Sequence, residues 1–136
     1  MNKIEWTDDL SVGIEVIDDQ HKKWIEHYNN AVEAIEAKHE VAQISRSLGF
    51  LSDYTETHFS TEEQAMAESG YPELEEHKAK HDALRKTLSA MAEEFIEDGA
   101  TDMLAESVET FLGNWLIKHI EEVDKRFAAF THASRL

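Results

Sequence analysis

Six polar residues of metal-binding type occur on apolar stripes at helical spacing along this sequence of 136 residues. They comprise five of its eight histidines and one glutamate: His21, His58, Glu62, His77, His81 and His119. A buried polar group without a partner costs about 1–3 kcal/mol, whereas a whole domain is stable by only about 5–15 kcal/mol. A metal ion would convert these desolvated lone pairs into bonds, so the pattern predicts a metal site.

Local spacing supports that prediction. His58 and Glu62 are four residues apart, and so are His77 and His81, which places each pair on one helix face. One such pair is a weak signal, because it also occurs on solvent-exposed faces. The three other histidines lie off the stripes or near expected loops, and we interpret them as surface residues: His27, His39 and His132.

Turn and capping signals divide the chain into four segments that we expect to be helical. Asp18 and Asp19 can cap a helix start, while Ser69–Pro72 and Asp98–Gly99 are turn signals. Each segment has apolar residues at alternating spacings of three and four. The expected helices cover roughly residues 19–37, 41–67, 73–96 and 102–127. The stripe of the fourth reads Leu104, Val108, Phe111, Leu112, Trp115, Leu116, His119 and Val123.

Four such helices with short loops can bury their stripes only against one another. We therefore predict an all-α, antiparallel up-down-up-down four-helix bundle with an irregular N-terminal arm, in a single domain spanning residues 1–136. The six polar residues fall near the starts of the first and third helices and near the ends of the second and fourth. In an antiparallel bundle all of them lie at the same end, so one common site is possible.

Composition excludes several classes of protein. The chain has no cysteine, which rules out disulfides, iron–sulfur clusters and thiolate metal sites. The formal net charge of −16 argues against nucleic acid and anionic membranes as partners. No apolar run approaches the roughly 20 residues of a membrane span, and the first residues lack a signal-peptide pattern. We expect a cytoplasmic protein and, from its acidic surface, a monomer.

The chain resembles the hemerythrins, particularly the single-domain bacterial members. The resemblance extends over essentially the whole chain and rests on motifs in a fixed order. They are Trp6, Val12–His21, His58–Glu63, His77-x-x-x-His81 and His119-Ile120-x-x-x-Asp124.

The resemblance implies a non-haem di-iron centre in which His77, His81 and His119 bind one iron and His21 and His58 bind the other. Glu62 and Asp124 would bridge the irons, with an oxo or hydroxo group as a third bridge. For two octahedral irons this set leaves one position open, on the iron with two histidines, where O2 would bind. Asp124 is assigned by resemblance alone. It lies about 140° beyond His119 on an ideal helix, and spacing alone favours Glu122.

Apolar residues are expected to wall the oxygen site: Trp24, Ile25, Phe59, Trp115, Leu116 and Ile120. No serine, lysine or tyrosine stands beside them on the stripes as an evident proton donor, and a dry pocket favours reversible binding. Ordinary core packing also accounts for most of these residues. Trp24 departs from the family, in which a leucine is usual, and its bulk would narrow access to the site.

Four functions follow in order of preference. The first is reversible O2 binding by a carrier, storage or delivery protein, with an oxygen-using enzyme as a conceivable recipient. The second is an oxygen, redox or nitric-oxide sensor that acts through a separate signalling partner. The third is a di-iron enzyme, against which the ligand pattern argues: its one Glu-x-x-His motif, Glu36 to His39, stands at a helix end, away from the other ligands. The fourth is a metal-free bundle.

Overall fold

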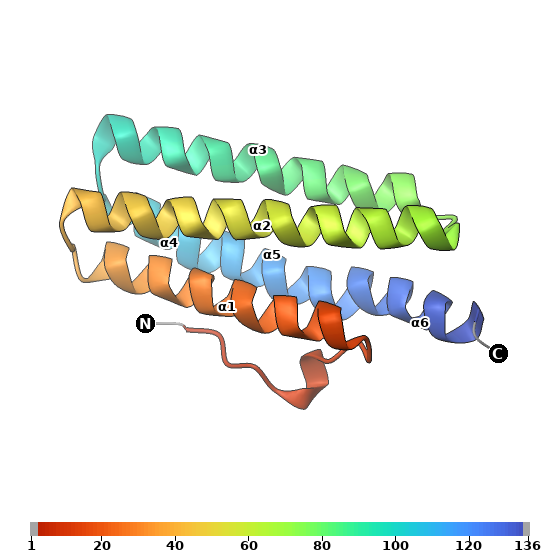
Figure 1. Cartoon of the computed structure of the whole chain (residues 1–136). Coiled ribbons are helices and arrows are strands. Elements are labelled where there is room, and N and C mark those ends of the chain that lie inside the picture. Colours follow the sequence, from red (N-terminus) through yellow and green to blue (C-terminus); the bar gives the residue numbers. More distant parts are fainter. Residues whose placement is uncertain (1–2, 135–136) are drawn as a thin grey trace.

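The structure is a computed structural model that describes residues 3–134, so the ends of the expected domain, residues 1–2 and 135–136, lie outside it. Four antiparallel helical runs form a bundle, and the N-terminal arm follows α1 along its outer side (Figure 1). The first three runs are α1 (Glu15–Glu36), α2 (Val41–Ser69) and α3 (Leu74–Asp98). No strand occurs among the described residues. The predicted four-helix bundle is confirmed.

The fourth run is a single helix with two wider turns. It consists of α4 (Asp102–Glu106), the π-turn η2 (Ser107–Leu112), α5 (Gly113–Lys118), the π-turn η3 (His119–Asp124) and α6 (Lys125–Ser134). The backbone stays right-handed through the joints, with φ −60° and ψ −46° at Gly113 and φ −63° and ψ −46° at His119. A π-turn bonds residues five apart, so each one changes which side chains face the core.

Two helix ends differ from the expected ones. The first helix begins at Glu15, four residues before the expected start, so Asp18 lies inside it and does not cap it. Its carboxylate instead accepts hydrogen bonds from the Ser11 hydroxyl and from the Val12 N–H, which ties the arm to α1. The fourth run continues to Ser134, beyond the expected end at residue 127. At the end of α2, Gly70 takes the left-handed conformation with φ 69°, as the turn signal indicated.

The expected stripes face the core with one clear exception. Phe111 was expected on the stripe of the fourth helix, yet it is 49% exposed. The widened turn η2 turns Val108 and Leu112 into the core and leaves Phe111 outside. Tyr28 packs against the same turn and donates a hydrogen bond to the Glu109 carbonyl, at 2.9 Å. No helix among the described residues is long and apolar enough to cross a bilayer.

Candidate metal centre

All seven residues expected to bind metal lie at one end of the bundle, and none is more than 3% exposed. His21 comes from the second turn of α1, and His58 and Glu62 come from the second half of α2. The other three histidines do not join them. His132 is exposed, whereas His27 and His39 are half-buried rather than fully on the surface. The first two turns of α3 and the π-turn η3 supply the rest of the cluster: His77, His81, His119 and Asp124.

The π-turn η3 explains why Asp124, and not Glu122, faces the cluster. On an ideal α-helix the five-residue step from His119 would turn Asp124 well away. Because η3 spans these six residues as one wider turn, His119 Nε2 and Asp124 Oδ1 lie 3.1 Å apart. Glu122 is exposed. The spacing rule would have chosen Glu122, and it fails here because it assumes a regular helix.

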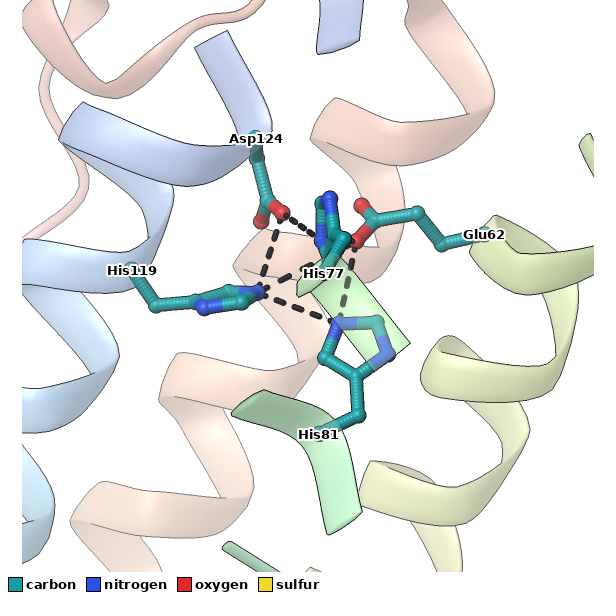
Figure 2. Close-up of side chains that lie close together, drawn as sticks. All are labelled: Glu62, His77, His81, His119 and Asp124. Atoms are coloured by element: carbon teal, nitrogen blue, oxygen red, sulfur yellow. Dashed lines mark hydrogen bonds and ion pairs between the residues drawn. The ribbon is translucent and has the colours of Figure 1, made fainter. Parts of the chain in front are cut away.

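Three histidines converge on one oxygen atom of each carboxylate (Figure 2). Glu62 Oε1 lies 2.6 Å from His77 Nε2 and 3.2 Å from His81 Nε2. Asp124 Oδ1 lies 3.1 Å from the Nε2 atoms of both His77 and His119. The ring nitrogens of His81 and His119 are themselves 3.1 Å apart. Five ligand atoms thus surround one point.

The remaining two histidines lie against the opposite oxygen of each carboxylate. Asp124 Oδ2 is 2.8 Å from His21 Nε2, and Glu62 Oε2 is 3.6 Å from His58 Nε2. His21 and His58 approach each other to 3.1 Å through their Nε2 atoms. Each carboxylate therefore offers one oxygen to a three-histidine group and the other oxygen to a two-histidine group.

Several of these buried atoms lack hydrogen bonds. Among the described residues, both oxygens of Glu62, both oxygens of Asp124 and Nε2 of His77 have no hydrogen-bond partner. The atoms lie close to neighbouring ligand atoms, but these contacts do not have hydrogen-bond geometry. Burying acceptors that have no hydrogen bond costs folding free energy unless a cation binds them. The cluster therefore fits metal ions.

Protonation states agree with that fit. Burial, reinforced by His21, lowers the pKa of His58 to about 3, and burial also lowers the pKa values of His77 and His81. Burial and the neighbouring Asp124 raise the pKa of Glu62 well above its usual range. Burial alone would raise the pKa of Asp124, but His119, His21 and His77 outweigh it and lower that pKa. Neutral imidazoles are the form that metals bind.

Comparison with known proteins decides the family. The profile described as "Hemerythrin HHE cation binding domain" matches residues 12–130, which include all seven clustered residues. The chain belongs to the hemerythrin family. It is similar to the bacteriohemerythrin of Stenotrophomonas maltophilia, with 34% identity over 94% of this chain and 81% of that one. The bacteriohemerythrin of Methylococcus capsulatus is 30% identical over 93% of this chain and 95% of that one.

Solved hemerythrin structures share the fold. The crystal structure of a wild-type hemerythrin superposes with a TM-score of 0.84 at 29% identity, covering 94% of this chain and 97% of that one. The bacteriohemerythrin of Pseudomonas aeruginosa is 35% identical over 91% of this chain and 78% of its own length. The likeness thus extends over nearly the whole bundle and includes the end that carries the cluster.

Two hydrogen bonds at the outer ring nitrogen, Nδ1, fix the rings of His58 and His81. His58 Nδ1 lies 2.9 Å from Oε1 of Gln20, whose amide nitrogen donates to Thr61 Oγ1. His81 Nδ1 lies 2.8 Å from Glu63 Oε2. Because an amide oxygen and a carboxylate only accept, each Nδ1 carries the proton and each Nε2 lone pair faces the cluster.

The sequence analysis did not predict that Gln20 and Glu63 contact residues of the site. Each directly adjoins a clustered residue in the sequence, and an adjacent residue on a helix normally points about 100° away, toward solvent. The sequence feature that could have indicated these contacts is the type of the two residues, since both side chains can accept a hydrogen bond. A hydrogen-bond acceptor next to a metal-binding side chain on a neighbouring helix can reach the outer nitrogen of a histidine.

Three aromatic residues of the expected apolar wall, Trp24, Phe59 and Trp115, contact the rings of the cluster. Five of the six wall residues are buried in the same core, and Trp115 is half-buried. Phe59 stacks on His81 with ring centres 3.8 Å apart, and Trp115 stacks on His119 at 4.5 Å. The buried five are Trp24, Ile25, Phe59, Leu116 and Ile120.

Trp24 covers the two-histidine group. Its ring centre is 5.1 Å from that of His58 and 6.2 Å from that of His21. The indole N–H donates to the Thr55 hydroxyl at 2.8 Å, and that hydroxyl donates to the Leu51 carbonyl at 2.7 Å. Thr55 is buried and polar, but its proton is committed to the backbone. It therefore fixes Trp24 and offers no free proton to the site.

Proposed function

We propose that the cluster holds two iron ions. His77, His81 and His119 would bind one, His21 and His58 the other, with Glu62 and Asp124 bridging them beside an oxo or hydroxo group. The observation that supports this most strongly is the division of the oxygens, in which each carboxylate offers one atom to each histidine group. Five imidazoles and two carboxylates also suit iron.

The function that this site supports best is reversible O2 binding, as a carrier, storage or delivery protein. Two ferrous ions supply the oxygen-binding chemistry when they are present. The chain's own part is to keep the open side, near His21 and His58, dry and without proton donors. Trp24 and Phe59 are fully buried there, and the Thr55 hydroxyl that holds the Trp24 indole donates to the backbone. Exclusion of water and protons slows irreversible oxidation, and it favours a binder over an enzyme.

A sensor that acts through a separate partner is the second candidate, and one observation favours it. Trp115 stacks on His119, and it also lines a surface groove of about 580 Å³ with Met103 and Phe111. Met103 is 70% exposed. A shift of His119 on a change of ligand or redox state would move an apolar surface that a partner could recognise.

Oxygen cycling tests the function. The iron-loaded protein is reduced without air, exposed to oxygen and returned to vacuum several times while its visible spectrum is followed. We expect an absorption band that appears with oxygen, disappears under vacuum and returns in each cycle. Irreversible conversion to the diferric spectrum in the first cycle would contradict carriage. Steady consumption of oxygen or peroxide over many turnovers would indicate an enzyme instead.

A further inference from the structure

The groups that accept the outer Nδ1–H hydrogen bonds differ in charge between the two histidine groups. On the two-histidine side His58 donates to the neutral amide of Gln20, at 2.9 Å. On the three-histidine side His81 donates to the carboxylate of Glu63, at 2.8 Å. The Nδ1 atoms of His21 and His77 have no partner among the described residues. Of the two outer hydrogen bonds, the one from His81 has an anionic acceptor and the one from His58 has a neutral acceptor.

Arg85 holds the Glu63 carboxylate in that position. Its guanidinium lies 3.1 Å from Glu63 Oε2, the same oxygen that accepts from His81. It also donates to Glu56 at 2.7 Å and to Asp82 at 2.7 Å. Burial alone would lower the pKa of Arg85, but the hydrogen bonds to Glu56, Glu63 and Asp82 outweigh it and raise that pKa. The guanidinium therefore stays charged.

A second contact joins Arg85 to the same histidine. The guanidinium lies over the ring of Phe59, 5.2 Å from its centre, and the same ring stacks in parallel on His81. Arg85 is 25% exposed and Glu63 only 18%, so water screens their interaction less than it screens an ordinary surface ion pair. Three acidic residues share this one arginine.

A carboxylate that accepts the outer N–H of a metal-bound imidazole makes the inner nitrogen a stronger donor, which stabilises the higher oxidation state of the ion. A cation on the same carboxylate oxygen weakens that effect. We propose that Glu63 and Arg85 are positioning residues that set the reduction potential of the ion held by His81, with Glu63 lowering the potential and Arg85 raising it. The inference rests on the proposed di-iron function.

A merely structural ion-pair network makes a different prediction. If Glu63 and Arg85 only tied α2 to α3, removing either one would loosen the same contact and shift the potential in the same direction. The electrostatic relay instead requires opposite shifts. Opposite signs from two neighbouring substitutions cannot come from a common loss of packing.

The test compares Glu63→Gln and Arg85→Gln in the iron-loaded protein. Arg46→Gln is the matched control, because Arg46 is an exposed arginine about 18 Å along α2 from His58. We expect a higher midpoint potential for Glu63→Gln, a lower one for Arg85→Gln and no change for Arg46→Gln. Arg85→Lys keeps the charge and is expected to stay near the wild-type value. Shifts of the same sign, or no shift in either variant, would overturn the proposal.

A measurement on the metal-free protein gives a second readout. The Nδ1 proton of His81 is expected as a downfield, slowly exchanging NMR signal that moves upfield in Glu63→Gln and further downfield in Arg85→Gln. The His58 signal serves as the internal reference and should not move. An unchanged His81 signal in both variants would overturn the relay. Failure of the wild-type protein to bind two irons would instead refute the proposed function and leave the hydrogen-bond result standing.

Discussion

His119 and Asp124 are five residues apart in the sequence, yet His119 Nε2 and Asp124 Oδ1 lie 3.1 Å apart because the helix widens to a π-turn over these six residues. The turn bonds residues five apart, so it brings both side chains to the same face. A regular α-helix would have presented Glu122 in place of Asp124. The backbone conformation of the fourth helix thus positions two side chains of the candidate metal centre.

Substitution of Asp124 tests that relationship. We expect Asp124→Ala to bind at most one iron per chain, because one of the two shared carboxylates is lost from both histidine groups. Glu122→Ala is the matched control, since Glu122 is an exposed acid two residues away, and it should bind two irons. Iron content after gel filtration, measured by elemental analysis, gives the answer. Equal iron content in the two variants would show that Asp124 is not a ligand.

The wall over the two-histidine group is tested at Trp24. Trp24→Leu removes a fully buried indole, so we expect a loss of about 2 kcal/mol in stability and faster oxidation by oxygen. Trp24→Phe retains most of the bulk and should oxidise at close to the wild-type rate. The rate of conversion to the diferric spectrum in air is the measurement. If both variants oxidised at the wild-type rate, Trp24 would not control access.

Two helical glycines, Gly113 next to η2 and Gly49 in α2, are expected to respond in opposite ways to an added methyl group. A Cβ at Gly113 would lie 2.5 Å from the hydroxyl of buried Tyr28, so we expect Gly113→Ala to cost about 1–3 kcal/mol. A Cβ at Gly49 meets nothing within 4 Å, and Gly49→Ala should stabilise the helix by about 0.5–1 kcal/mol. Urea unfolding of the two variants decides the matter. A neutral Gly113→Ala would mean that Tyr28 moves aside freely.

The metal-free protein should become less stable as the pH falls from about 6.5 to about 4.5. The pKa values of His58, His77 and His81 are lowered on folding, so their contribution is present above about pH 6.5 and is lost as pH falls. Glu62, whose pKa is raised, opposes them above about pH 4.5. Unfolding takes up protons at these histidines and releases one from Glu62, so stability falls as the pH falls between these limits, by about 1.4 kcal/mol per pH unit for each proton of net uptake.

Urea unfolding at several pH values between 4.5 and 6.5 measures this slope. Glu62→Gln removes the opposing group, so the net proton uptake rises by about one and the slope steepens by about 1.4 kcal/mol per pH unit. A flat profile in the metal-free protein, or the same slope in the variant, would contradict the assigned directions of the pKa values.

Periodicity was sufficient to predict the helices and the clustering of their polar residues. The spacing of apolar residues encodes which helix face is buried, and the antiparallel order then places His21 beside His58 and His77 beside Glu62. Backbone hydrogen-bond register is not encoded in that way. The sequence reading therefore assigned Asp124 by resemblance alone and placed Phe111 in the core, whereas the π-turns decide both positions.

The outer hydrogen bonds could not be predicted for a related reason. Gln20 and Glu63 reach histidines on neighbouring helices, and helix rotation and separation set those contacts. Arg85 depends further on the relative height of α2 and α3, because it joins Glu56 and Glu63 to Asp82. Patterns within a single helix contain no information about these distances.

A crystal structure of the iron-loaded protein, with anomalous data collected at the iron edge, tests the central claim most directly. We expect two iron peaks, one enclosed by His77, His81 and His119 and the other by His21 and His58, with Glu62 and Asp124 each in contact with both. A single peak, or two peaks that share neither carboxylate, would contradict it.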